Sequence, residues 1–190
     1  MNTAFIGLDY IVDIMDERGK IAISASHAAQ RDCIAKANKA LHIAREKGWL
    51  TILVKLGFSS NYYEQPKNSP MFSKVHTSNA LSLEEKGTNF HPALDVQPLD
   101  LIITKPRISA FYSTMLEAAL RANKIDRLIV AGVSSVWAVQ STVRDAHDRD
   151  YEVYVLEDAC AASSEEMHQI SMKMLFLIAK IINIQDMAKL

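Results

Sequence analysis

The stretch that decides the fold is Leu128-Ile129-Val130-Ala131-Gly132-Val133-Ser134-Ser135-Val136-Trp137-Ala138-Val139-Gln140-Ser141-Thr142. It opens with four apolar residues, continues through a turn of small residues and leads into a helical pattern over residues 141–149. A strand, a tight turn and a helix in this order point backbone N–H groups at the end of the strand, where they can bind an anion. The stretch therefore predicts a site at the carboxyl end of a strand in an α/β protein.

Short apolar runs alternate with amphipathic segments along the rest of the chain. This alternation predicts a three-layer α/β fold, a mainly parallel sheet with helices on both faces. In such sheets ligands bind at the carboxyl ends of the strands, near the point where the strand order reverses. The expected strands are 4–8, 49–54, 100–104, 128–130, 152–156 and 181–184, and the expected helices are 27–47, 114–123, 141–149 and 165–180.

Residues 57–91 show neither a helical nor a strand period and are rich in Ser, Asn, Tyr, Pro and Lys. A loop of this length in a compact domain usually covers a site or binds a partner. Its aromatic and apolar side chains either hold the loop down or line the pocket. These side chains are Tyr62, Tyr63, Met71, Phe72 and Phe90.

Composition limits the possible functions. A chain of 190 residues is expected to form a single domain, 1–190, and 49% hydrophobic with 23% charged residues is typical of globular proteins. A net charge of -1 gives no electrostatic reason to bind nucleic acid or a membrane surface. Residues 1–9 lack the basic start of a signal peptide, and no apolar run approaches about 20 residues, so we expect neither a signal peptide nor a membrane span. The two cysteines, Cys33 and Cys160, lack metal-ligand spacing, so we expect a cytoplasmic protein without metal or cofactor.

Two ionisable residues follow expected strands. Asp9 comes after the first strand and Lys105 after the third. Each alone is ordinarily a capping or solvated side chain, but as a pair at adjacent strand ends each would keep the other ionised. Arg107, two residues further on, either binds a substrate carboxylate through two hydrogen bonds or pairs with an acidic surface residue.

These residues and their order resemble the isochorismatase-like hydrolase superfamily, which includes cysteine hydrolases. The resemblance rests on Asp9, on Lys-Pro-Arg-x-Ser-Ala-Phe from Lys105, on Gly-Val-Ser-Ser-x-x-Ala-Val-x-Ser-Thr-x-Arg-Asp-Ala from Gly132, and on Glu-Asp-Ala-Cys-Ala from Glu157. It extends over nearly the whole chain, and the order and spacing of its motifs are specific.

The resemblance implies a role for each matching position. Amidases of the family use an Asp–Lys–Cys triad, so Asp9 corresponds to the acid/base, Lys105 to the lysine and Ala138 to the nucleophile position. Backbone N–H groups of Ser134 and Ala138 would bind the oxyanion, with a cis peptide between Val133 and Ser134. A small molecule is the implied substrate.

The chain also departs from the family pattern. Ile11 stands where the family usually has glutamine, and the histidine ligands of its zinc-binding nicotinamidases have no counterpart at 54–58, which argues against zinc and nicotinamidase activity. Ala138 carries no thiol, so a thioester cannot form at that position. Val136 and Trp137 before it suggest a remodelled turn, and Trp137 either packs on the helix or lines the pocket.

Three interpretations follow from the missing thiol. In the first, which we favour, Asp9 acts as general acid/base without a covalent nucleophile, as in the isochorismatases that hydrolyse a vinyl ether. In the second, the chain is a catalytically silent small-molecule-binding relative. In the third, it is a Cys→Ala form of a C–N amidohydrolase. Because the family is commonly oligomeric and the 57–91 loop carries aromatic residues, we also expect a homodimer or homotetramer.

Overall fold

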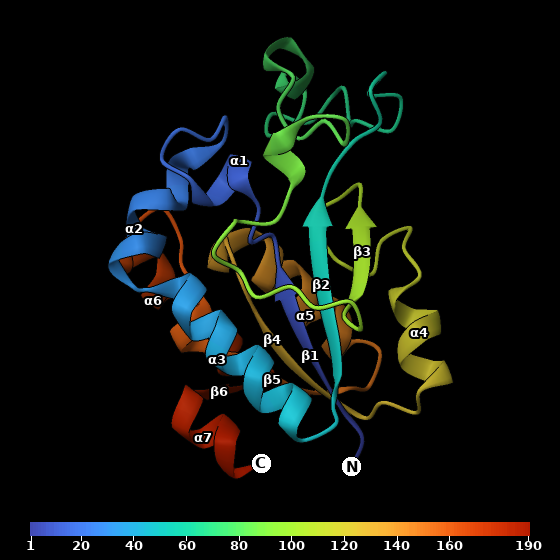
Figure 1. The fold of residues 1–190 in the computed structure, drawn as a ribbon, viewed down its shortest axis with the longest axis vertical. Helices are drawn as coiled ribbons and strands as arrows, with labels where there is room; N and C mark the ends of the chain where they lie inside the picture. Colours follow the sequence, from blue (N-terminus) through green and yellow to red (C-terminus); the bar gives the residue numbers. More distant parts are fainter.

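The computed structural model describes all 190 residues and is built around one six-stranded parallel sheet. The strand order is β3-β2-β1-β4-β5-β6, a doubly wound arrangement in which the order reverses between β1 and β4 (Figure 1). The predicted fold class is confirmed. The strands are β1 (Thr3–Leu8), β2 (Leu50–Leu56), β3 (Leu101–Lys105), β4 (Arg127–Gly132), β5 (Glu152–Leu156) and β6 (Lys180–Ile182).

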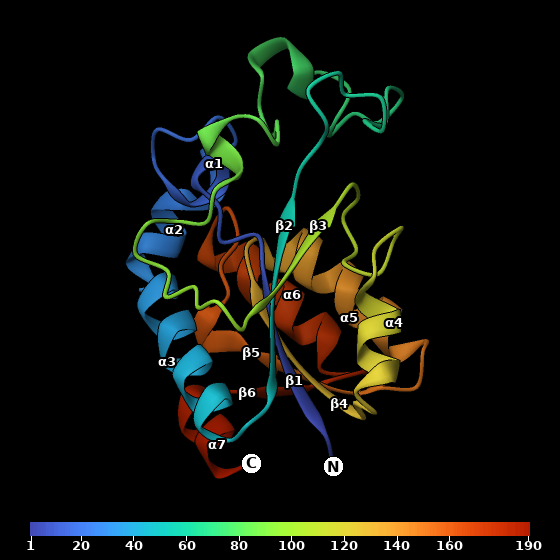
Figure 2. The same cartoon turned by 45° about the vertical axis from the view of Figure 1, so that its right-hand side comes forward.

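Helices cover both faces of the sheet. One face carries α2, α3 and α7, and the other carries α4, α5 and α6 (Figure 2). The short helix α1 lies near the carboxyl end of β1 (Figure 1). The helices are α1 (Val12–Met15), α2 (Ala25–Gln30), α3 (Cys33–Glu46), α4 (Leu116–Ala122), α5 (Gln140–His147), α6 (Glu165–Leu175) and α7 (Ile184–Lys189).

The central strands are apolar because both of their faces are covered. Every residue of β1 is buried, and so are five of the six residues of β4. Such strands appear as continuous apolar runs instead of an alternating pattern. The arrangement fixes the ends of β1 and β4 side by side, since Leu8 is in register with Gly132.

Several element boundaries differ from the sequence-based expectation. The helix predicted over 27–47 is two helices, broken at Asp32, which adopts a left-handed conformation with φ 52°. Helix α6 ends at Leu175, five residues earlier than predicted. The chain then forms β6, near the predicted last strand, and ends in a helix, α7, that the sequence did not predict. The Asn183 side chain caps α7 by accepting from the N–H of Asp186 at 2.9 Å.

Residues 57–91 are more ordered than a plain loop. They contain two short 3₁₀ turns, Val75–Ser78 and Lys86–Thr88, and contribute most of a second buried apolar cluster, which Ile11 and Leu56 complete. The Asp13 carboxylate ties this segment to α1 by accepting from the N–H of Leu81 at 2.8 Å. The segment rises beyond the carboxyl ends of β2 and β3 (Figures 1 and 2). The aromatic residues of this segment, which supported the expectation of an oligomer, do not form an exposed patch, because Tyr62 and Phe72 are buried and only Tyr63 is widely exposed.

None of the helices combines the length and apolar character that a membrane span requires.

Candidate functional site

An ion pair lies at the carboxyl edge of the sheet. Asp9 directly follows β1 and Lys105 ends β3, and the distance from Asp9 Oδ2 to Lys105 Nζ is 2.8 Å. The sequence suggested that these strand ends are adjacent. In the structure β2 lies between β1 and β3, and the two side chains meet across its end. Asp9 turns its side chain toward this edge through a left-handed backbone conformation with φ 58°, which aspartate adopts more readily than most residues.

Both members of the pair are almost completely buried. The second oxygen of the Asp9 carboxylate, Oδ1, accepts from the N–H of Leu56 at 2.8 Å. Burial raises the pKa of Asp9 above its usual range, although Lys105 and the Leu56 N–H act in the opposite direction. Lys105 Nζ also donates to the carbonyl of Ile108 at 2.7 Å. An ammonium group has three donors, so one N–H of Lys105 is left without a protein acceptor.

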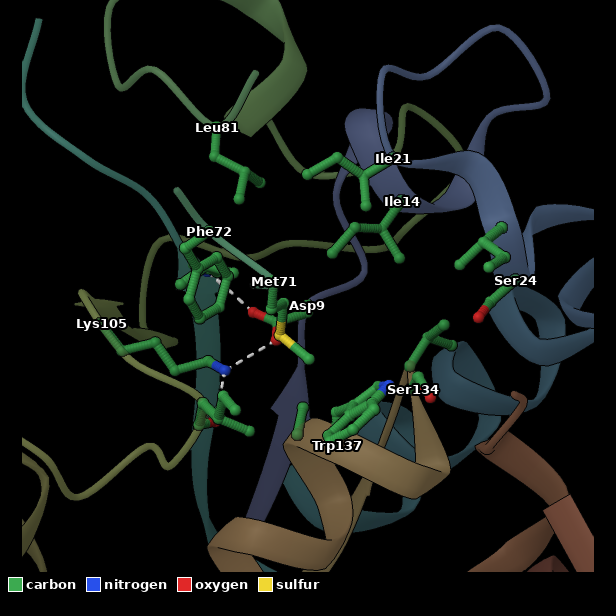
Figure 3. A pocket seen from close by; sticks show the side chains of 15 residues that line it. Asp9, Ile14, Ile21, Ser24, Met71, Phe72, Leu81, Lys105, Ser134 and Trp137 are labelled. Carbon is green, nitrogen blue, oxygen red and sulfur yellow. Dashed lines mark hydrogen bonds and ion pairs between the residues drawn. The ribbon is translucent and has the colours of Figure 1, made fainter. Parts of the chain in front are cut away.

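The pair forms part of the lining of a cavity of about 250 Å³ (Figure 3). Eleven of its fifteen lining residues are hydrophobic. Helix α1 and the chain after it contribute Ile14, Ile21 and Ser24, and the 57–91 segment contributes Met71, Phe72 and Leu81 (Figure 3). The remaining lining residues are Ile23, Leu56, Ile108, Val133, Ser134, Trp137 and Ala138.

The turn after β4 closes the cavity on another side. Gly132 has φ 152°, and a Cβ there would lie 2.4 Å from the carbonyl oxygen of Leu8, so only glycine fits. The Val133–Ser134 peptide is cis, as the family resemblance implies. The N–H of Ser134 has no acceptor within the protein, and Ser134 lines the cavity. It is therefore available to a ligand.

The helix start expected after this turn is a π-helical segment, Ser135–Val139, which continues into α5. π-Helical turns are rare and occur frequently at functional sites. Ala138 lies in this segment, is buried and lines the cavity together with Trp137, a residue that is 54% exposed. A side chain at position 138 would thus face the same cavity as Asp9.

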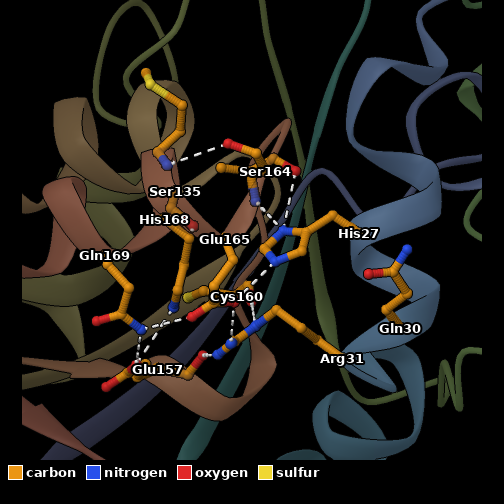
Figure 4. Close-up of polar contacts among 12 residues, drawn as sticks. His27, Gln30, Arg31, Ser135, Glu157, Cys160, Ser164, Glu165, His168 and Gln169 are labelled. Carbon is orange, nitrogen blue, oxygen red and sulfur yellow. Dashed lines mark hydrogen bonds and ion pairs between the residues drawn. The ribbon is translucent and has the colours of Figure 1, made fainter.

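A buried polar network contacts the turn after β4 through Ser135 (Figure 4). Ser135 Oγ and His168 Nδ1 form a hydrogen bond of 2.8 Å, and His168 Nε2 lies 3.4 Å from a carboxylate oxygen of Glu157. The hydroxyl of Ser171 donates to the Ser135 carbonyl at 2.9 Å. Burial lowers the pKa of His168. Sequence reasoning missed this network. Ser135 and Glu157 belong to the motifs that carry the resemblance, but no local pattern links them to His168 and Ser171, which are distant along the chain.

Arg107 does not line the cavity. One of its Nη atoms donates to the carbonyls of Glu64 and Pro106, at 2.7 and 2.6 Å, and its guanidinium lies 5.4 Å from the ring centre of Tyr112. The structure thus supports neither expectation for Arg107, substrate binding or a surface ion pair. The guanidinium group of Arg107 is suited to bind a carboxylate, but the hydrogen-bond acceptors it has in the structure are backbone carbonyls.

The two cysteines lie outside the cavity lining. Both are buried, and burial raises both thiol pKa values, that of Cys33 to about 12. No three His, Cys, Asp or Glu side chains come together in a way that would hold a metal ion.

Comparison with known proteins identifies the class to which this fold and site belong. Residues 3–186 match the model of the isochorismatase domain. The chain belongs to the isochorismatase family of hydrolases.

Particular relatives agree with this. An uncharacterised isochorismatase family protein from Escherichia coli O157:H7, YecD, is 29% identical over 180 residues. The alignment covers 93% of this chain and 91% of YecD. A ureidoacrylate amidohydrolase, RutB, from Acinetobacter baylyi is 34% identical over 155 residues, 73% of this chain but 62% of that protein. The fold is also that of a cysteine hydrolase from Pseudomonas syringae pv. phaseolicola, with a TM-score of 0.89, 22% identity, and coverage of 99% and 91% of the two chains.

Proposed function

We propose that this protein hydrolyses a small molecule without a covalent nucleophile and that Asp9 is its general acid/base. The observation that carries the proposal is the buried Asp9–Lys105 pair on the cavity lining. In the resting site the Asp9 carboxylate is paired with Lys105, and burial raises the pKa of Asp9, so the carboxylate takes up the proton that a general acid donates more readily than an exposed one would. Ala138, at the position that corresponds to the family's nucleophile, leaves no group on that residue to attack a carbonyl.

The reaction that suits these groups is hydrolysis of a vinyl ether. The Asp9 carboxyl donates its proton to the terminal vinyl carbon, which gives an oxocarbenium ion and an Asp9 carboxylate. A water adds to the oxocarbenium carbon and returns a proton to Asp9. The resulting hemiacetal or hemiketal then collapses to a carbonyl compound and an alcohol, so one water is consumed and Asp9 is regenerated.

The other residues of the site position these steps. Lys105 holds the Asp9 carboxylate through Oδ2, and its remaining N–H is free to bind the water. The unpaired N–H of Ser134 is available for an oxygen of the substrate. The small side chain of Ala138 leaves the space that a thiol would otherwise occupy.

A second candidate is a catalytically silent binding protein. It is favoured by the fact that both oxygens of Asp9 already accept hydrogen bonds within the protein. Such a protein would keep the apolar cavity and bind a small molecule without converting it. The amide hydrolysis named for the RutB relatives is less well supported, since thioester formation needs a thiol at position 138.

Turnover assays separate the two candidates. We expect hydrolysis of butyl vinyl ether to acetaldehyde and butanol, in a panel that also contains isochorismate and small amides, and loss of that activity in Asp9→Asn. Saturable ligand binding without turnover of any compound would favour the silent protein and overturn the proposed reaction.

We also propose that residues 1–190 act as one domain and associate into a cytoplasmic homodimer or homotetramer. Exposed apolar side chains on the turn after β4 and on α6 support self-association, because contiguous apolar surface usually marks an interface. They are Trp137, Met167, Ile170 and Met174. Light scattering over a concentration series is expected to give two or four chain masses. A constant mass near 21.2 kDa would contradict this assembly.

A further inference from the structure

We propose that the ligand of this cavity is an uncharged molecule with an apolar body and that the cavity discriminates against carboxylates. The inference rests on the proposed function in assigning the cavity as the substrate site. It goes beyond it in naming the substrate class, which a family resemblance leaves open.

The first observation is the charge of the lining. Asp9 and Lys105 are its only ionisable residues, and at 2.8 Å they neutralise each other. A substrate carboxylate would meet no unpaired cation there and would approach the Asp9 carboxylate, which carries the same charge. Burying a carboxylate without a partner is strongly unfavourable.

The second observation is that cations next to the cavity are already bound to the protein. Arg107, which follows β3, donates to the carbonyls of Glu64 and Pro106. Lys20, next to the lining residue Ile21, donates to the carbonyl of Asn79 at 3.0 Å. Neither residue lines the cavity, so neither is placed to bind a carboxylate within it.

The third observation is the shape and chemistry of the wall. Ile14, Ile21 and Leu81 face the Asp9–Lys105 pair from one side of the cavity, with Met71 and Phe72 beside the pair (Figure 3). A volume of about 250 Å³ is below the range of pockets that hold drug-sized ligands. The cavity therefore fits a ligand with a small apolar body. The free N–H groups of Lys105 and Ser134 can donate hydrogen bonds to one uncharged group of that ligand that carries an oxygen.

Paired ligands that differ only in charge test this inference. Hexanamide and hexanoate have the same chain length, and their binding to the protein can be measured by calorimetry without any turnover. We expect hexanamide to bind at least about tenfold more tightly than hexanoate. Met71 is 39% exposed at the cavity, so it can be replaced with little loss of folding. Met71→Arg is expected to reduce the preference for hexanamide about fivefold or more, and Met71→Gln to leave it unchanged.

Three results would overturn the inference: equal or tighter binding of hexanoate, no binding of either compound up to about 10 mM, or an equal effect of Met71→Arg and Met71→Gln. The inference and the proposed function fail separately. Preferential hexanamide binding without hydrolysis of any vinyl ether would overturn the reaction and leave the ligand class standing. Hydrolysis of a vinyl ether together with tight hexanoate binding would overturn the ligand class and leave the reaction standing.

Discussion

Asp9 Oδ2 and Lys105 Nζ lie 2.8 Å apart although their strands, β1 and β3, are separated by β2. The pair spans the end of β2, where the N–H of Leu56 donates to the other oxygen of Asp9. Three strands therefore converge on one carboxylate. This convergence places an ionisable group on the wall of a mostly apolar cavity.

Removing one member of the pair is expected to leave a buried, unpaired charge. We expect Asp9→Asn and Lys105→Met each to lower the free energy of unfolding by about 3–5 kcal/mol. The double variant should lose less than the sum of the two, because no charge then remains unpaired. Urea denaturation of all four proteins gives the coupling directly.

An exposed ion pair provides the control. Lys189 Nζ and Asp186 Oδ1 lie 3.5 Å apart near the end of the chain, and the two side chains are 75% and 47% exposed. Lys189→Met is expected to change stability by less than about 1 kcal/mol. Additive losses at Asp9 and Lys105 would show that the pair does not act as a unit.

The turn after β4 requires glycine at position 132. A Cβ there would clash with the carbonyl of Leu8, so we expect Gly132→Ala to cost about 3 kcal/mol or more in unfolding free energy. Gly48→Ala is the matched control, because φ at Gly48 is also positive, 65°, but no atom lies within 4 Å of the added Cβ. Its cost is expected to be about 1 kcal/mol. Equal costs at the two positions would show that the contact with Leu8 is not decisive.

His168 is expected to make stability depend on pH. Burial lowers its pKa in the folded state, so the unfolded chain takes up the proton first as pH falls through about 6.5. The stability that neutral His168 contributes is complete above that pH and is lost below it, in an environment that also holds Glu157, Glu165, Arg31 and His27.

The measurement is the urea midpoint at about pH 7.5 and about pH 5.5, on either side of the ordinary histidine pKa. His168→Gln should lose less stability than the wild type over this interval. His42→Gln is the control, because His42 is exposed and pairs only with Glu46 in the next turn of the helix. An identical pH dependence in wild type and His168→Gln would rule out His168 as the responsible group.

The sequence was sufficient for the sheet and for the charged part of the site. Residues 152–156 were predicted as a strand with the observed bounds, and Asp9 and Lys105 were selected as the ionisable pair. Such positions are predictable because apolar runs and strand-end residues are local features.

Features that depend on tertiary contacts were missed. The break at Asp32 follows from a backbone conformation within an otherwise helical pattern. The apolar cluster that residues 57–91 form with Ile11, the cavity wall from Ile14, Ile21 and Leu81, and the Ser135–His168 contact all join residues distant in sequence. No periodicity records such contacts, so only the structure reveals them.

A thiol introduced at position 138 reports on the electrostatics of the site. In Ala138→Cys we expect a thiol pKa below the ordinary value of about 8.5, because Lys105 and the free N–H of the turn favour the thiolate. Iodoacetamide labelling against pH measures this, and the wild type provides the control, since Cys33 and Cys160 are buried. We expect no efficient amide turnover in this variant, because Ile11, Val136 and Trp137 depart from the amidase pattern. Titration like a free thiol would show that the site no longer favours an anion at this position.

The most direct test of the central claim is hydrolysis of butyl vinyl ether in D₂O. If Asp9 protonates the vinyl carbon, the wild type should produce acetaldehyde with one deuterium in its methyl group, at a rate above the buffer reaction. Asp9→Asn should fall to the buffer rate, because an amide has no proton of suitable acidity to donate. Mass spectrometry of the product gives both the rate and the label. The account predicts enzyme-dependent, singly deuterated acetaldehyde that disappears with Asp9; equal rates in wild type and Asp9→Asn would contradict it.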